Sequence, residues 1–261
     1  MKHNAALRYS ALFLGTLLAA NSSFAGFSAR GSDSTINVVK ALAEAFQTKS
    51  GIAIQIEGGG SGAGAKAAMA GEVQLAFLSR ALDEKEKAGG LNGSTYAIDA
   101  VAVIVNNDNP ASNLTLAELK DLFTGTTAAW PDGKPVVPYN RNADSGTREI
   151  FQDKVLGKGV AFSASAAIKH DGVLLGAVAK ITSSVGYDGF GHVDQKLVKI
   201  VAVNGVLPSP ATIRSGAYPL TRTPTFATKG DVNAEVKSFV DFAMSPEGQA
   251  IVVQNGLVSL K

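Results

Sequence analysis

The sequence predicts an α/β protein with two lobes, each built on a mixed sheet flanked by helices. Two observations predict this architecture. Short apolar runs typical of strands alternate with helical patterns through residues 27–79, and this βαβαβ order favours a largely parallel sheet. Two longer apolar runs, at 96–108 and 197–206, then enclose a segment that has helices of its own. A chain of 261 residues is long enough to form two such cores.

The first lobe should begin with a strand at 27–32, followed by a helix at 36–50. Apolar side chains recur on one face of that helix, and Gly51 suits the left-handed residue that often ends a helix. A strand at 52–57, a small-residue helix at 65–71 and a strand at 73–79 complete the alternation.

The enclosed segment predicts helices at 114–123, 145–157 and 172–181. A strand-like run at 218–230 and helices at 234–244 and 245–256 follow the second long apolar run. We therefore expect lobe 1 to contain residues 26–105 and 204–261, lobe 2 to contain residues 106–203, and two crossing strands to join them.

The N-terminus has the pattern of a secretory signal peptide. Lys2 and Arg8 precede the apolar run ALFLGTLLAA, and the small-residue site SSFA follows it. The apolar run is too short to span a membrane comfortably. We expect cleavage after Ala25, which would leave a free, soluble exported protein, since no cysteine is present to carry a lipid anchor.

Composition narrows the range of partners. Without residues 1–25, 22 of the 24 Lys and Arg residues remain against 22 Asp and Glu, so a nucleic-acid or anionic-membrane partner is not indicated. The absence of cysteine means that core packing must hold the exported protein together without disulfides. Two isolated histidines, His170 and His192, are a poor basis for a metal site, so no metal is expected.

Three segments place hydroxyl groups and flexible backbone where a helix is expected to begin: GSDST at 31–35, GGGSGAG at 58–64 and DSGT at 144–147. Unpaired N–H groups and the helix dipole attract anions at such positions. An ordinary helix cap could explain each segment alone. However, two of them belong to lobe 1 and one to lobe 2, and Arg141 precedes the third. Because its guanidinium can bind an oxyanion through two parallel hydrogen bonds, we expect a cleft that holds an oxyanion between the lobes.

The glycine run does not fit the common enzyme motifs. In a P-loop, Lys66 would be one residue late, and no Ser or Thr follows it. In a dinucleotide-binding fold, the acidic partner Asp83 would lie in a polar stretch beyond the strand. The segment around Ser61 reads GGSGA, one residue away from the hydrolase pattern G-x-S-x-G. We therefore predict no enzymatic activity and no cofactor.

Several segments together resemble the periplasmic phosphate-binding proteins of high-affinity phosphate ABC transporters, and they follow that family's order over nearly the whole mature chain. The segments are GSDST, GGGSGAG with LAFLSRAL, NLTLAELKDLFTG, RNADSGTREIF, SSVGYDGFG, SGAYPLTR and FVDFAMSPEGQAIV. The resemblance implies a type II periplasmic binding fold that closes on one phosphate without chemistry. It also implies a monomeric receptor that delivers phosphate to a permease and ATPase complex in the inner membrane.

The family's ligand contacts can be carried over by motif. They fall on nine residues of this chain: Asp33, Ser34, Thr35, Ser61, Ser79, Arg141, Ser145, Gly146 and Thr147. The chain departs from one familiar form of the family, which has threonine at position 33 and a proton-accepting aspartate at position 79. The two differences are complementary, so Asp33 is either the acceptor of the ligand's proton or a helix cap. Arg80 either reaches the cleft or forms a surface ion pair, and we favour the ion pair.

Two other functions remain open at this stage. A receptor for sulfate or molybdate would use the same two-lobed design, but those ligands carry no proton at neutral pH and have no use for a carboxylate acceptor. A secreted phosphate-ester hydrolase would turn its ligand over, whereas a receptor would only bind it. Phosphate binding is the function that the sequence favours.

Overall fold

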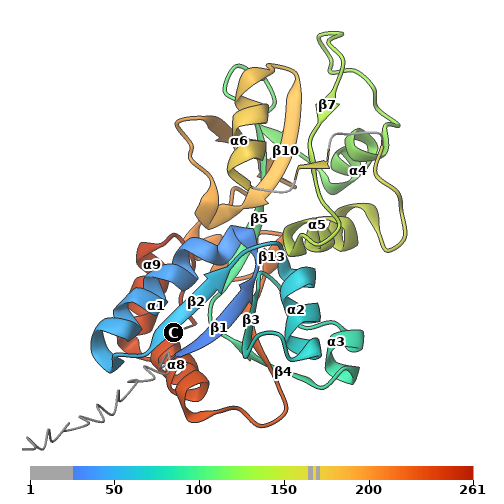
Figure 1. Cartoon of the computed structure of the whole chain (residues 1–261). Coiled ribbons are helices and arrows are strands. Elements are labelled where there is room, and N and C mark those ends of the chain that lie inside the picture. Colours follow the sequence, from blue (N-terminus) through green and yellow to red (C-terminus); the bar gives the residue numbers. More distant parts are fainter. Residues whose placement is uncertain (1–25, 164–166, 169–170, 261) are drawn as a thin grey trace, which may run out of the picture.

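The computed structural model describes residues 26–163, 167–168 and 171–260, which form two lobes around separate sheets (Figure 1). The predicted two-lobed α/β fold with mixed sheets is confirmed. The predicted signal peptide, residues 1–25, and His170 lie outside the described residues. Within the described ranges, no helix has both the length and the hydrophobicity needed to cross a membrane.

The sheet of lobe 1 has the strand order β2-β1-β3-β14-β4. The strands are β1 (Gly26–Gly31), β2 (Ala53–Glu57), β3 (Leu75–Leu78), β4 (Leu91–Thr95) and β14 (Thr225–Lys229). β1 runs parallel to β2 and β3, whereas β14 runs antiparallel to β3 and β4. The parallel part is the βαβαβ unit that the sequence predicts.

Helices cover both faces of this sheet. Since successive side chains of a strand point to opposite faces, Leu75 and Phe77 of β3 join one core while Ala76 and Leu78 join another. The first core holds α1 (Ile36–Ser50), α8 (Ala234–Met244) and α9 (Pro246–Gln254), and the second holds α2 (Ser61–Ala70). α1 ends at Gly51, whose φ of 75° confirms the predicted left-handed residue.

The sheet of lobe 2 has the order β11-β5-β10-β7. Its strands are β5 (Asp99–Asn106), β7 (Val137–Pro138), β10 (Ser184–Gly189) and β11 (Val198–Ile200), and a fifth strand, β13 (Thr221–Arg222), pairs with β5 outside this order. The helices of this lobe are α4 (Leu116–Thr124), α5 (Gly146–Phe151), the wider π-helix η2 (Gln152–Leu156) and α6 (Asp171–Lys180). The predicted helix at 145–157 therefore changes its winding after Phe151.

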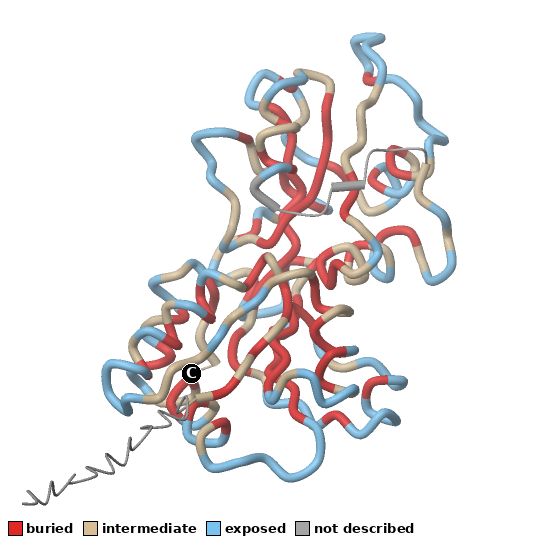
Figure 2. Tube along the Cα trace, viewed as in Figure 1, coloured by how far each residue is buried: buried red, intermediate tan, exposed pale blue. Residues whose placement is uncertain are grey.

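The lobes meet where β13 (Thr221–Arg222) pairs antiparallel with the start of β5. Figure 1 shows these two strands at the junction, and Figure 2 shows buried residues both there and inside each lobe. The predicted run at 218–230 is divided between β13 and β14, with Pro224, which has no N–H to donate, between them. Because β5 pairs with β10 and β11 from Val101 to Asn106, the second sheet begins before residue 105. The lobe boundaries predicted from the sequence stay a prediction.

The long run predicted at 197–206 is also two strands. β11 pairs antiparallel with β5, whereas β12 (Ala202–Val203) pairs parallel with β6 (Asn113–Leu114). The other short elements are η1 (Asp33–Thr35), α3 (Glu84–Ala88), β8 (Asn140–Arg141), β9 (Ala167–Ile168), η3 (Phe190–His192) and α7 (Pro210–Arg214).

Candidate anion-binding site

Arg141 ends the short strand β8 and is buried between the lobes, with 1% of its side chain exposed. Its Nη2 lies 3.8 Å from Oδ2 of Asp33 in lobe 1, and its Nη1 lies 4.0 Å from Oδ1 of Asp188 in lobe 2. Burial lowers the pKa of Arg141, and the charges of Asp188 and Asp33 act in the opposite direction. An arginine remains charged in proteins, so a full positive charge lies in the interior of the molecule.

The loop after β1 places Asp33 beside this charge. Oδ1 of Asp33 accepts a hydrogen bond of 2.9 Å from the backbone N–H of Gly59, which ties the first loop to the glycine run. A Cβ atom at Gly58 would overlap the same carboxylate oxygen. Glycine at position 58 leaves room for this close approach of Asp33.

Two hydroxyl groups meet across the interface between the lobes. Oγ of Ser34 lies 3.1 Å from Oγ1 of Thr147, and the Ser32 hydroxyl lies 3.0 Å from that of Ser34. Arg222 donates to both sides of this contact, from Nη1 to Thr147 at 2.7 Å and from Nη2 to Ser34 at 3.3 Å. All of these side chains are buried, so the hydrogen bonds lie out of reach of bulk water.

A second pair of hydroxyls lies against the start of α5. Oγ of Ser61 is 3.2 Å from Oγ of Ser79 and accepts a hydrogen bond of 3.0 Å from the Ser79 backbone N–H. A Cβ atom at Gly146 would lie 2.7 Å from the Ser79 hydroxyl and closer still to that of Ser61. Glycine at position 146 lets the helix of lobe 2 approach the serines of lobe 1.

The backbone of the glycine run also touches lobe 2. The N–H of Gly62 donates to the carbonyl oxygen of Asp144 at 3.1 Å. Gly60 has a φ of 105°, a conformation that favours glycine, and a Cβ there would overlap that carbonyl. The glycine run thus forms a direct backbone contact between the lobes.

Two of the predicted site residues have other partners. Ser145 is the N-cap of α5 and accepts a hydrogen bond from the N–H of Arg148, so it is both a cap and a neighbour of the site. Thr35 has a different neighbour. Its hydroxyl lies beside Tyr96 in the core of lobe 1, where burial raises the pKa of Tyr96 and the Thr35 hydroxyl acts in the opposite direction.

Sequence reasoning missed three charged residues at the site: Asp99, Asp188 and Arg222. Asp99 Oδ2 accepts hydrogen bonds from Nε and Nη2 of Arg222 at 2.8 and 2.6 Å, and both side chains are almost fully buried. Asp188 accepts from the N–H of Gly189 at 2.7 Å and lies 3.2 Å from Nδ1 of His192. The hydrogen bond to Asp188 raises the pKa of His192, while burial acts to lower it.

The chain matches the model of the PBP superfamily domain over residues 18–247. The chain belongs to this superfamily. Protein SphX of Synechocystis is 30% identical over 245 residues, which cover 82% of this chain and 73% of that protein. The phosphate-binding protein PstS of Bacillus subtilis is 29% identical over 241 residues, which cover 87% of this chain and 78% of that protein.

Solved structures of the superfamily agree with these relatives. A protein of Clostridium perfringens, described as a phosphate ABC transporter substrate-binding protein and solved with bound phosphate, is 34% identical. Its TM-score is 0.87, over 90% of this chain and all of that chain. An ABC-type phosphate transport receptor of Vibrio cholerae is 26% identical with a TM-score of 0.76, over 88% of this chain and 98% of that one. The resemblance predicted from the sequence is confirmed.

Arg80 links the lobes of this PBP-superfamily protein beside the site. Its guanidinium forms a bidentate pair with Glu86, at 2.8 Å to each carboxylate oxygen, and also pairs with Glu149 of α5. Burial acts to lower the pKa of Arg80, but the hydrogen bonds and charges of Glu86 and Glu149 outweigh it and raise that pKa. The expected ion pair exists, but the pair with Glu86 is buried and a second pair, with Glu149, spans the lobes, whereas the sequence favoured a surface pair.

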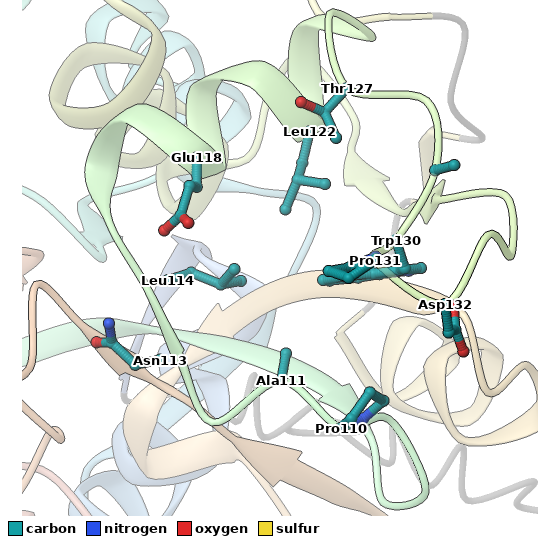
Figure 3. A pocket seen from close by; sticks show the side chains of 11 residues that line it. Pro110, Ala111, Asn113, Leu114, Glu118, Leu122, Thr127, Trp130, Pro131 and Asp132 are labelled. Carbon is teal, nitrogen blue, oxygen red and sulfur yellow. The ribbon is translucent and has the colours of Figure 1, made fainter.

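An open cavity elsewhere in lobe 2 has the wrong chemistry for an anion. It measures about 770 Å³ and is lined by apolar side chains such as Leu114, Leu122 and Trp130 (Figure 3). The charged residues that line it, Glu118 and Asp132, are both acidic. The positive charge and the converging hydroxyls lie instead at the contact between the lobes.

Gly146→Ala provides a first test of the site. Because the added methyl group would press on the hydroxyls of Ser61 and Ser79, we expect it to hold the lobes apart and weaken anion binding by about 1–3 kcal/mol. Gly176→Ala is a matched control in α6, where a Cβ has nothing within 4 Å. Titration calorimetry of the two variants checks this. Equal affinities in both variants would contradict a tight contact at Gly146.

Proposed function

We propose that this protein is an exported periplasmic receptor that binds inorganic phosphate between its two lobes and delivers it to an ABC transporter. The observation that carries the proposal is the buried Arg141, which faces Asp33 of the other lobe, next to the contact between the Ser34 and Thr147 hydroxyls. An oxyanion in such a place would exchange its hydration for charge-assisted hydrogen bonds, which are about twice as strong as neutral ones. Relatives and structural neighbours described as phosphate-binding proteins support phosphate as the anion.

Each predicted site residue except Thr35 has a role in the proposal. Arg141 supplies the positive charge, the hydroxyls of Ser61 and Thr147 donate hydrogen bonds to phosphate oxygens, and the Ser34 hydroxyl supports that of Thr147. The start of α5 offers the backbone N–H of Gly146 at the positive end of a helix dipole, and the Ser145 hydroxyl, which accepts from the Arg148 N–H, can donate its proton to the ligand. Ser79 supports Ser61, and Asp33 accepts the proton that phosphate keeps near neutral pH.

The export of the protein, its oligomeric state and its transporter partner are part of the same proposal. Cleavage near Ala25 would release a monomeric receptor that acts without a cofactor and without chemistry of its own. Its partner would be a permease and ATPase complex in the inner membrane. An assay with an ester such as p-nitrophenyl phosphate distinguishes the two functions. A phosphate-ester hydrolase would cleave the ester, whereas the proposed receptor leaves it intact.

Titration calorimetry on the chain from residue 26 tests the function directly. We expect phosphate to bind at one site per chain, arsenate to compete with it because it has the same shape and also keeps a proton, and sulfate to bind far more weakly. Tight sulfate binding would identify a general oxyanion receptor. No heat with any of the three anions would contradict an oxyanion-binding function.

Domain closure is expected to follow ligand binding. The contacts of Ser34 with Thr147, Arg80 with Glu149 and Gly62 with Asp144 all join the two lobes. Because phosphate would bridge the same surfaces, we expect small-angle scattering to give a smaller radius of gyration with phosphate than without it. The Arg141→Ala variant at the same phosphate concentration is the control. Identical profiles for wild type with and without phosphate would argue against closure by the ligand.

A further inference from the structure

Arg222 lies directly behind the hydroxyls that the proposed function uses. It belongs to β13, pairs in register with Asp99 of β5, and so is fixed where the chain crosses between the lobes. Its side chain is fully buried, and a Cβ at Gly189 would overlap its Nη2. Glycine at position 189 leaves the space that the guanidinium fills.

The hydrogen bonds of Arg222 run in one direction only. A guanidinium has donors and no acceptor, so Thr147 and Ser34 must both accept at the hydrogen bonds that Arg222 makes with them. A hydroxyl group has one donor and two acceptor positions, so each of these hydroxyls has one acceptor position filled.

The neighbouring hydroxyls can fill the remaining acceptor positions. When Ser32 donates to Ser34 and Ser34 donates to Thr147, both acceptor positions of Ser34 and of Thr147 are occupied. The proton of Thr147 is then the one left to donate. An anion that enters between the lobes meets a donor there and finds no acceptor, which suits a fully deprotonated oxygen.

From these hydrogen bonds we infer that Arg222 is a positioning residue for anion binding, which fixes the Thr147 hydroxyl, with Ser34 donating to it, as a donor toward the ligand. The inference rests on the proposed function, because it concerns the same site. The inference also assigns the two kinds of ligand oxygen to different places. An oxygen without a proton faces Thr147, and the protonated oxygen must donate to an acceptor elsewhere in the site. Since Ser34 and Thr147 come from different lobes, Arg222 can hold both only when the lobes are together.

A double-mutant cycle on phosphate affinity tests this role. We expect Arg222→Met and Thr147→Val each to weaken phosphate binding on the order of tenfold or more, because each removes the oriented donor. If Arg222 acts through the Thr147 hydroxyl, the combined variant should bind no more than about threefold more weakly than the worse single variant. Arg80→Met is the matched control, since Arg80 is also buried, ion-paired and between the lobes but makes no hydrogen bond to these hydroxyls. The fold-loss of phosphate affinity in Arg80→Met should multiply with the fold-loss in Thr147→Val when the two are combined.

A second version of the cycle covers the case in which Arg222→Met alone does not fold. Asp99→Asn together with Arg222→Met removes both charges of the buried pair, so no carboxylate is left without its partner. In that background we again expect Thr147→Val to cause little further loss of phosphate affinity. If the wild type binds phosphate but the affinity losses of the Arg222 and Thr147 substitutions multiply in the combined variant, the inference is overturned and the proposed function is not. Arg222 would then only support the strands that cross between the lobes. A wild type that does not bind phosphate would overturn the proposed function and the inference with it.

Discussion

Arg141→Ala is expected to weaken phosphate binding by about 3 kcal/mol or more, the largest affinity loss of any single substitution considered. The guanidinium is 1% exposed and is flanked by the carboxylates of Asp33 and Asp188. Truncation therefore removes the positive charge and also leaves two negative charges facing the anion. Arg141→Lys should recover only part of the loss, because an ammonium group cannot reproduce the two parallel hydrogen bonds of a guanidinium.

Lys66→Ala is the matched control for this prediction. Lys66 is another cation at the contact between the lobes, but 73% of its side chain is exposed, and it pairs with Asp144 at 3.1 Å. Exposed ion pairs contribute about 0–1 kcal/mol, so phosphate affinity should barely change. Calorimetry on the three variants decides the matter, and an Arg141→Ala protein with wild-type affinity would remove Arg141 from the site.

Local patterns in the sequence predicted the elements that local physical chemistry determines. The helix at 234–244 has the predicted bounds because its apolar side chains recur at helical spacing. β10 was missed as a strand because its sequence, SVGYDG, mixes glycine and polar residues, although all six residues are buried. Its polar side chains are accommodated individually: the Ser184 hydroxyl donates to the carbonyl of Val178, and Asp188 accepts from Gly189.

The site, too, has some residues that local sequence patterns reveal and others that only the fold brings together. Its hydroxyls and Arg141 lie in local motifs at helix starts, which a sequence displays directly. Asp99 and Arg222 are 123 positions apart and meet only through the pairing of β5 with β13. One signal was available: each is a charge within a strand-like run, and a buried charge requires a partner. Which partner it finds is a property of the fold.

Asp33→Asn is expected to change the selectivity of the site more than its affinity for phosphate. Phosphate near neutral pH keeps at least one proton and can donate it to a carboxylate, whereas sulfate carries none and would meet Asp33 as an unpaired like charge. A site with such a buried acceptor discriminates strongly, because the wrong ligand leaves the acceptor unpaired and adds repulsion. We expect Asp33→Asn to narrow the ratio of phosphate to sulfate affinity by roughly a hundredfold or more.

The structure makes asparagine a clean substitution at this position. Oδ1 of Asp33 accepts the Gly59 N–H at 2.9 Å, and an asparagine can keep that bond through its carbonyl oxygen. The amide group can then donate to an oxygen of either anion, so it removes the repulsion of sulfate without removing a contact to phosphate. The loop should keep its place, and a change in selectivity would report the loss of the carboxylate, both as a charge and as an acceptor.

Asp188→Asn is the control that separates the two carboxylates beside Arg141. Asp188 lies about as far from the guanidinium as Asp33 does, but it is already engaged by the N–H of Gly189 and by His192. Competition of sulfate against phosphate at fixed pH, on wild type and both variants, measures the ratio in each case. If the ratio narrows in Asp188→Asn and not in Asp33→Asn, the proton acceptor is Asp188. If only Asp33→Asn narrows it, the carboxylate of the first loop performs the task for which the familiar form of the family uses the aspartate at position 79.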